Sequence, residues 1–204
     1  MHVRDLAESL KLLLTLPLEP SGSRAKGRYG AGGEYYLTPR PVNDLIAKRY
    51  WLLKSEPSVF SIDDLAACPN QTACWDGVRN YQARNFLRDQ IQLGDQAFFY
   101  HSSCKQPGIA GIVSITRTGY PDPTALDPAN PCFDPLSTAT QPRWFAVDVK
   151  LAGKFARLLT LSELRRYPEL VDLLLLKRGH RLSVMPVHPK HWRFILSLAG
   201  QISA

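Results

Sequence analysis

Five short apolar segments in the second part of the chain most strongly constrain how it can fold. In each, apolar residues run together or alternate with polar ones, which is typical of a strand that is buried on one or both faces. Pro186 lies in the last segment and restricts it to the end or the edge of a sheet, because proline cannot donate a ladder hydrogen bond. The five segments are RYWLLKS (49–55), GDQAFFYHS (94–102), GIAGIVSITRTGY (108–120), RWFAVDVKLAGKFA (143–156) and RLSVMPV (181–187).

Helix signals are scattered among these strands without a regular βαβ rhythm. Ser61 and Asp64 resemble a capping box and predict a short helix, and Pro168 would break the longest helical segment. Such a mixture predicts an α+β fold, with a small, curved, largely antiparallel sheet or barrel and helices packed around it. The predicted helices are SIDDL (61–65), YQARNFLRDQ (81–90), TLSELRRYPELVDLLLLKRG (160–179) and HPKHWRFILSLAG (188–200).

The first part of the chain has a different character. It contains the Gly-, Ser- and charge-rich stretch EPSGSRAKGRYGAGGEYY (19–36), which has no strong period. We therefore expect residues 1–47 to be a weakly ordered N-terminal extension. The chain has 204 residues, which suits one domain with one good core, so we expect residues 48–204 to form a single domain.

Several functional classes find no support in the sequence. No apolar run approaches the ~20 residues of a membrane span, and the four cysteines lack zinc-like spacing. Glycine-rich phosphate loops and HExxH motifs are absent, so we expect no cofactor and no metal. The formal net charge of +7 favours contact with phosphate backbones. We expect a monomer that does not bind membranes, located in the cytoplasm, or in the nucleus if the source is eukaryotic.

Polar residues gather where two of the predicted strands end. KSEP (54–57) follows the first strand, and YHSSCKQ (100–106) ends the second and enters a turn. Binding sites are often built at such strand ends, although a merely solvated strand end has the same composition. His101 and Cys104 would suit a thiol nucleophile with a base, but nothing supplies a third, orienting group.

The segment CWDGVRNYQARNFL (74–87) allows two interpretations. Trp75 could stack on a flat ring and Asn80 could offer a bidentate amide edge. Alternatively, Trp75 anchors the core, Asp76 and Gly77 form a turn, and Asn80 caps a helix. The sequence is compatible with both at once, because a helix cap can also face a pocket.

Many of these segments, in this order, resemble the EVE domain family. The resemblance extends from about Arg49 to Ala199 and rests on ordered motifs. These are YWLLKSEP, SIDDL, WDGVRNYQARNFL, GDQAFFYHSS, PGIAGIVSI, YPDPTALDP, PRWFAVDV, LSELRR and KRGHRLSVMPV.

The resemblance implies a PUA-like fold, a small mixed β-barrel of five to six strands surrounded by helices. It also implies a reader of a modified base, notably modified cytosine, in DNA or RNA, related to the YTH domains that hold a methylated base in an aromatic cage. Arg79 and Arg84 are candidates for contacts with the neighbouring phosphates. The ligand-binding residues carried over by motif are Lys54, Ser55, Glu56, Trp75 as a cage wall, Asn80 as a polar edge, His101, Ser102, Arg181 and Ser183.

Two other hypotheses compete with that of a protein that binds a modified base. Some PUA-like folds hydrolyse acylated cytidine with a Lys and a Glu, and Lys54 and Glu56 are the candidates here, Lys54 acting as the base if burial lowers its pKa. The third hypothesis is a scaffold whose pocket is filled by side chains around Trp75.

Overall fold

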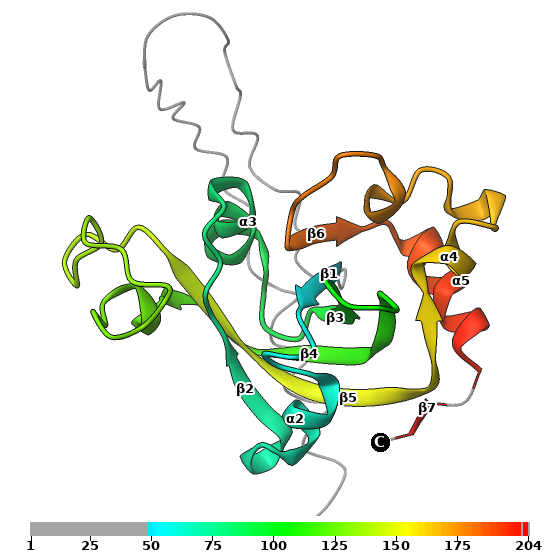
Figure 1. Ribbon diagram of the computed structural model, residues 1–204, viewed down its shortest axis with the longest axis horizontal. Helices are drawn as coiled ribbons and strands as arrows, with labels where there is room; N and C mark the ends of the chain where they lie inside the picture. Colours follow the sequence, from blue (N-terminus) through cyan, green and yellow to red (C-terminus); the bar gives the residue numbers. More distant parts are fainter. Residues whose placement is uncertain (1–48, 201, 204) are drawn as a thin grey trace, which may run out of the picture. The chain divides into compact units, whose positions relative to one another are not determined.

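The computed structural model describes residues 49–200 and the backbone of 202–203. The predicted extension over 1–47 lies outside the described residues. The described part folds around one mixed sheet (Figure 1). Its strands are β1 (Tyr50–Ser55), β2 (Thr72–Trp75), β3 (Gln96–His101), β4 (Gly108–Pro121), β5 (Phe145–Thr160), β6 (Val184–Val187) and β7 (Ile202–Ser203).

The strand order is β2-β5-β4-β3-β1-β6, with the short β7 paired to β5. Only β1 and β3 are parallel to each other in this part of the chain; the remaining pairs are antiparallel. The α+β class and the mixed sheet are therefore confirmed. The sheet stays open, because its end strands β2 and β6 do not pair with each other, so the expected barrel is not closed.

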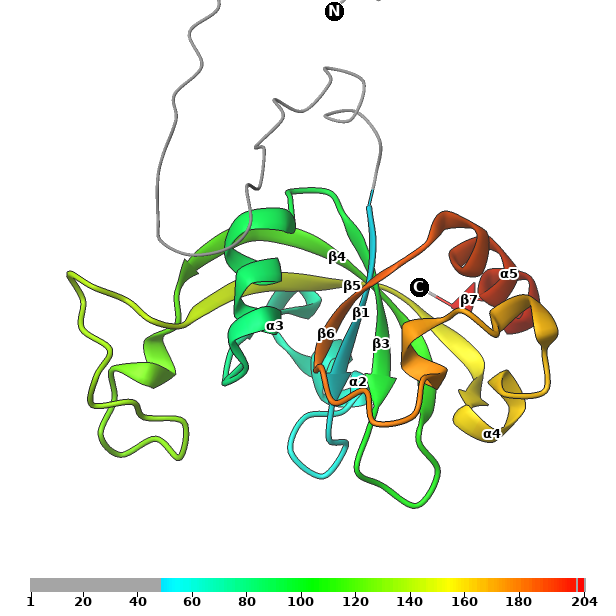
Figure 2. The ribbon, with the colours of Figure 1, turned by 90° about the horizontal axis from the view of Figure 1, so that it is seen from above.

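A proline explains the edge position of β6, and register shifts explain the curvature of the sheet. Pro186 lies in β6, which is an edge strand paired only with β1 among the described strands, as its missing N–H requires. The long strands β4 and β5 pair with several register shifts, and such bulges bend a sheet and increase its twist. Figure 2 shows the resulting curved ribbon of β4 and β5 passing beneath β1 and β6.

Helix caps predicted from the sequence are present in the structure. Ser61 and Asp64 form a reciprocal capping box at the start of α2 (Ile62–Ala67), and Asn80 caps α3 (Tyr81–Asn85). His188 caps α5 (Pro189–Ala199). The four-residue strand β2 was not predicted, because TACW is too short to show a period.

The helical segment predicted over 160–179 breaks at Pro168 as expected, but it is shorter than predicted on both sides of the break. Only α4 (Leu161–Leu164) is α-helical there, followed by two 3₁₀ turns, η6 (Pro168–Leu170) and η7 (Leu174–Leu176). Pro168 lacks an N–H and forces Tyr167 into an extended conformation, which ends the first helix. Further short turns are η3 (Pro69–Gln71), the π-helical η4 (Phe86–Gln90) and η5 (Pro123–Ala125).

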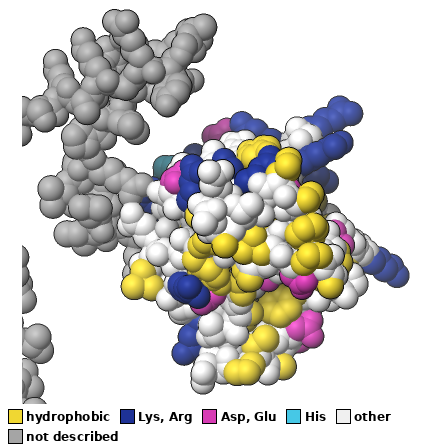
Figure 3. Space-filling model, turned by 90° about the vertical axis from the view of Figure 1, so that its left-hand side faces the viewer, with side chains coloured by type: hydrophobic (Ala, Val, Ile, Leu, Met, Phe, Trp, Pro, Cys, Tyr) yellow, Lys and Arg dark blue, Asp and Glu magenta, His cyan; other side chains and the backbone are white. Residues whose placement is uncertain are grey.

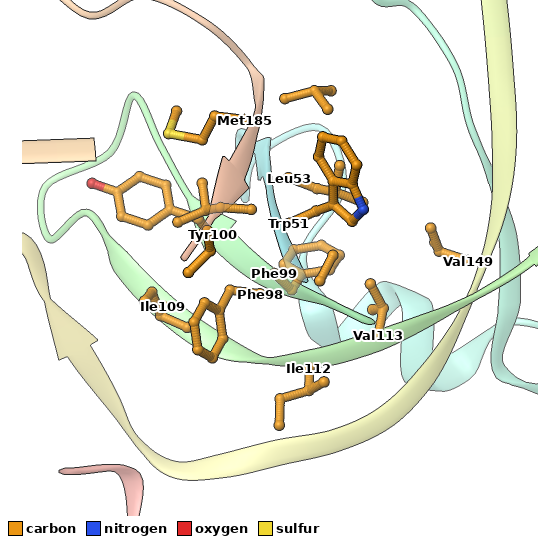
Figure 4. Packing of buried hydrophobic residues seen from close by; sticks show 14 of the residues in the cluster. Trp51, Leu53, Phe98, Phe99, Tyr100, Ile109, Ile112, Val113, Val149 and Met185 are labelled. Atoms are coloured by element: carbon orange, nitrogen blue, oxygen red, sulfur yellow. The ribbon is translucent and has the colours of Figure 1, made fainter. Parts of the chain in front are cut away.

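The central strands β1 and β3 are buried on both faces. Leu52, Leu53, Phe98 and Phe99 are all fully buried, and neighbours in a strand point to opposite faces. Trp192 of α5 stacks on Phe98 at 4.0 Å between ring centroids, so α5 covers that face. Figure 4 shows Phe98, Tyr100 and Ile109 on one side of these strands and Trp51, Phe99 and Val149 on the other. The side chains at the ends of β1 and β3 also alternate between these two faces.

Candidate nucleic-acid interface

The ends of β1 and β3 and the start of β6 meet at one edge of the sheet. The backbone N–H of Ser102 donates to the carbonyl oxygen of Ser55 at 2.7 Å, and the Ser102 hydroxyl donates to the same oxygen at 3.2 Å. The backbone N–H of Lys54 donates to the carbonyl oxygen of Ser183 at 2.8 Å. Four residues predicted to share a site are therefore close together, because parallel strands bring their carboxyl ends to the same edge.

Strand alternation nevertheless puts Lys54 and Ser55 on opposite faces. Ser55 is in register with His101, and its hydroxyl donates to the carbonyl oxygen of Phe60 at 2.6 Å. Lys54 is in register with Tyr100, and its Nζ lies 6.0 Å from the centroid of that ring. Burial lowers the pKa of Lys54. The predicted group thus shares an edge of the sheet but not a single wall.

His101 anchors α2 to the end of β3. Its Nε2 accepts a hydrogen bond from the backbone N–H of Ile62 at 3.1 Å, and its ring meets the Phe99 ring edge-on at 5.6 Å. Burial lowers the pKa of His101, and the nearby carboxylate of Asp63 only partly opposes this. A nitrogen that accepts this bond must be unprotonated, so His101 is held neutral and has no free Nε2 lone pair with which to activate Cys104.

This bond predicts an acid-sensitive contribution to stability. The unfolded chain takes up a proton on His101 near its ordinary pKa of about 6.5, whereas the folded chain resists it, so the unfolded state binds more protons. The free energy of unfolding should therefore fall as the pH drops from about 7 to about 5. Urea unfolding at several pH values measures this fall.

A His101→Gln variant provides the comparison, because the glutamine oxygen can accept the Ile62 bond without titrating. His180 and His191 also have pKa values lowered by burial and stay in both proteins. The difference between the two pH profiles therefore isolates His101, and identical profiles would contradict its role.

Trp75 ends β2 inside an aromatic cluster. Its side chain is only 6% exposed and meets Phe99 edge-on, with ring centroids 5.2 Å apart. Phe60 packs against the same ring at 6.2 Å, and His101 contacts it from the strand end. The interpretation of Trp75 as a core anchor is confirmed. Trp75, Phe60 and His101 thus all pack on the Phe99 ring, and the carbonyl oxygen of Phe60 accepts the Ser55 hydroxyl bond.

Asn80 is exposed and only half of its amide is used. Its Oδ1 accepts from the backbone N–H groups of Gln82 and Ala83 at 2.9 and 3.0 Å. Its Nδ2 has no partner within residues 49–200. Gly77 adopts a positive φ of 69°, which confirms the predicted turn. Asn80 therefore caps α3 while keeping a free donor, as the sequence allowed.

Arg79 is bound within the protein. Its Nη1 lies 2.7 Å from Asp122 Oδ2, its Nε donates to the carbonyl oxygen of Cys132 at 2.8 Å, and its Nη2 donates to Cys132 and Thr124. Burial raises the pKa of Asp122, but the hydrogen bonds from Arg79 and Thr124 outweigh it and the net pKa is lowered. These bonds fasten the Pro-rich loop between β4 and β5 (residues 122–144) to the turn after β2. The phosphate contact predicted for Arg79 stays a prediction, against which this geometry weighs.

Arg84 is also engaged. Its Nε and Nη2 donate to Asn85 Oδ1, its Nη1 donates to the carbonyl oxygen of Arg143, and its guanidinium lies over the Tyr81 ring. Tyr81 stacks on Trp144 at 5.0 Å. This aromatic ladder joins α3 to the Pro-rich loop and was not foreseen, since its members are about 60 residues apart. The predicted phosphate contact of Arg84 likewise stays a prediction.

The remaining predicted residues lie at the rim of the strand edge. Glu56 is exposed on the turn after β1, where its carbonyl oxygen accepts from Val59 and Phe60. Arg181 is exposed just before β6, and Ser183 is half-buried beside Lys54. Within the described residues no three His, Cys, Asp or Glu side chains gather as a metal site. None of the helices in this part combines the length and apolar content that a bilayer crossing requires.

The described part of the chain is similar to known proteins. The model of the EVE domain matches residues 49–198. The chain belongs to the EVE domain family. Thymocyte nuclear protein 1 of Mus musculus is 48% identical over 166 residues, which are 73% of this chain and 73% of that protein. The resemblance read from the sequence motifs is thereby confirmed.

Solved structures of EVE domain proteins superimpose well on this chain. A Pseudomonas putida protein is 55% identical with a TM-score of 0.70, covering 74% of this chain and 99% of that one. The human THYN1 protein, solved in complex with 5-methylcytosine-containing DNA, is 44% identical with a TM-score of 0.71. The match covers 76% of this chain and 99% of that one.

Proposed function

We propose that this chain is a non-catalytic reader that binds a modified cytosine in DNA. The observation that carries the proposal is the human THYN1 structure, solved in complex with 5-methylcytosine-containing DNA, whose chain in that structure is matched over 99%. The EVE domain occupies residues 48–204 in this proposal, and the family model covers 49–198 of them.

The local geometry supports a base-binding pocket at the edge where β1, β3 and the turn after β2 meet. A flipped base needs flat apolar walls and a few fixed hydrogen-bond partners. We assign Trp75 and the half-buried Phe60, which both pack on the fully buried Phe99, to its aromatic wall, and the free Nδ2 of Asn80 to its rim. We assign Ser55, His101 and Ser102 to the same side of the pocket, with Glu56, Arg181 and Ser183 at its rim.

Burial of one methyl group contributes only ~1 kcal/mol. The affinity for 5-methylcytosine should therefore exceed that for cytosine by about fivefold. The remaining affinity must come from stacking, from the polar edge and from phosphate contacts.

The alternative of an amidohydrolase acting on acylated nucleosides is not favoured. Its two candidate residues have different surroundings. Lys54 is half-buried on the Tyr100 face, whereas Glu56 is exposed on the turn after β1. RNA binding and the monomeric state stay predictions. The vertebrate relatives are called nuclear proteins, and the compartment of this chain also stays a prediction.

Titration of fluorescent oligonucleotides, identical except for one 5-methylcytosine, tests the proposal. The wild-type protein should bind the modified oligonucleotide about fivefold more tightly. An Asn80→Ser variant should bind it about tenfold more weakly because a donor to the base is lost, while serine still caps α3. Gln82→Ala, on the exposed surface of the same helix, is the matched control and should bind as wild type. Equal wild-type affinity for the two oligonucleotides would overturn the proposal.

A further inference from the structure

Most arginines around the Pro-rich loop and α3 are not available to a phosphate. Besides Arg79 and Arg84, Arg143 pairs with Asp134 at 3.3 Å and Arg88 pairs with Asp89 at 2.7 Å. On the face that carries this loop, hydrophobic side chains occupy much of the centre and Lys and Arg lie mostly toward the margins (Figure 3). Exposed apolar side chains of the loop include Leu126, Phe133 and Leu136. Among the described residues, these four arginines are therefore already engaged by carboxylates or carbonyl oxygens of the protein.

Unpaired cations gather instead between α4 and β6. That stretch, residues 165–183, contains five Lys or Arg side chains and two carboxylates, and one carboxylate, Asp172, faces Lys190 at 3.8 Å. All five cations are exposed. Within residues 49–200 none of them has a side-chain hydrogen bond or an ion pair. They are Arg165, Arg166, Lys177, Arg178 and Arg181.

These cations continue to the strand edge that carries the proposed pocket. Lys54 Nζ lies 6.0 Å from the Tyr100 ring and is unpaired in the described part of the chain. Burial raises the pKa of Tyr100 to about 12, and the neighbouring charge of Arg165 opposes that rise. Burial also lowers the pKa of His180, and the charge of Lys54 lowers it further. The backbone N–H of Lys54 also donates to the carbonyl oxygen of Ser183, two residues after Arg181, so the strand edge adjoins the C-terminal end of the basic stretch.

The surface here is hollowed and partly apolar. Arg165 and Arg166 border a hollow of about 550 Å³, whose other walls are Tyr167, Pro168, Val171 and Leu176. Leu176 leads directly into Lys177 and Arg178, and Gly179 then turns the chain with a φ of 76°. Unpaired guanidinium groups present a rigid fork of donors that suits phosphate oxygens.

We propose that Lys54, Arg165, Arg166, Lys177, Arg178 and Arg181 form a basic track that binds the phosphates of the DNA strand beside the modified base. The proposal rests on the proposed function for the position of the base. It assigns the phosphate contacts to the stretch between α4 and β6 in place of Arg79 and Arg84. In this proposal the base binds at the edge of the sheet formed by β1 and β3. The DNA strand then leaves the base across the Tyr100 face toward the hollow.

Salt dependence of DNA binding tests the basic track. We would compare two double variants, Arg165→Gln/Arg166→Gln and Lys177→Gln/Arg178→Gln, with wild type on duplexes with and without 5-methylcytosine. Each lost phosphate contact should reduce the slope of log K against log salt by about 0.9. The same slope corresponds to about eightfold weaker binding per contact at 0.1 M salt, or roughly 60-fold for a double variant.

The matched control is Arg88→Gln/Arg157→Gln, which removes the same charge from residues that are already paired with Asp89 and Glu163. Its slope should stay within half a contact of wild type. The ratio of affinities for modified and unmodified duplexes should not change in the two track variants, because the base is read elsewhere. Thermal unfolding of every variant checks that the fold is kept.

The possible outcomes separate the two proposals. A wild-type slope in both track variants, or an equal loss of slope in the control, would overturn the basic track. A wild-type protein without preference for 5-methylcytosine would overturn the reader function, and the slopes on unmodified duplex would still decide the track. Loss of slope with an unchanged preference ratio supports both.

Discussion

Replacing Trp75 by alanine is expected to lower the free energy of unfolding by about 3–5 kcal/mol, the range for removing a large aromatic side chain from a core. The indole is 6% exposed and packs on Phe99 and its neighbours. Its loss would leave a cavity between β2 and the central strands. Urea unfolding followed by tryptophan fluorescence and circular dichroism measures the change.

Trp75→Ala does not test DNA binding, because partial unfolding of the variant would by itself abolish binding. Trp75→Phe keeps an apolar ring in the cluster and should fold, yet it offers a smaller stacking surface to a base. Phe133→Ala, a truncation of a 38% exposed ring on the Pro-rich loop, is the control and should change stability by less than about 1 kcal/mol. An alanine variant at 75 as stable as wild type would show that the indole faces the pocket more than the core.

Replacing Asp122 by alanine is expected to lower the free energy of unfolding by about 3 kcal/mol. The Asp122 side chain is fully buried, and its loss would leave Arg79 without its carboxylate partner and the backbone N–H of Gly77 without its acceptor. The value lies at the lower end of the range for a broken buried pair, because the Arg79 side chain is 24% exposed and can recruit water.

A double-mutant cycle with Arg79→Ala distinguishes a true pair from two independent losses. The double variant should be less destabilised than the sum of the single ones, since removing both partners leaves no buried unpaired charge. Asp89→Ala breaks the exposed pair with Arg88 and should cost less than about 1 kcal/mol. Additive effects at 79 and 122 would contradict the proposed coupling between the Pro-rich loop and the turn that leads to Asn80.

The sequence predicted the local features of this fold well. Strands with clear alternation and the helix caps at Ser61 and Asn80 are present in the structure. The break at Pro168 was predicted, but the leucine run after it shows a helical period that packing overrides. Leu170, Leu173 and Leu175 are all buried from short turns instead of from one helix.

The candidate site was predicted as a group of residues but not as an arrangement. The polar ends of β1, β3 and β6 lie side by side, and Trp75 packs on Phe99 of β3, whereas a shared ligand site for these residues and Asn80 stays a prediction. Neighbouring residues of a strand point to opposite faces, so Lys54 and Ser55 can be assigned to different faces once the bounds of β1 are known. No sequence signal, however, marked Asp122 as the partner of Arg79 or Trp144 as the partner of Tyr81.

The sequence by itself determined five of the strands, the helix caps at Ser61 and Asn80, the edge position of β6 and membership in the EVE domain family. These depend on side-chain period and on hydrogen bonds between residues a few positions apart. Only the tertiary structure decided which cations are free. The partners that occupy Arg79 lie 43 to 53 residues away, and such pairs form only when the path of the chain brings them together. The charge of an arginine is written in the sequence, but its availability to a phosphate depends on which distant carboxylate or carbonyl already binds it.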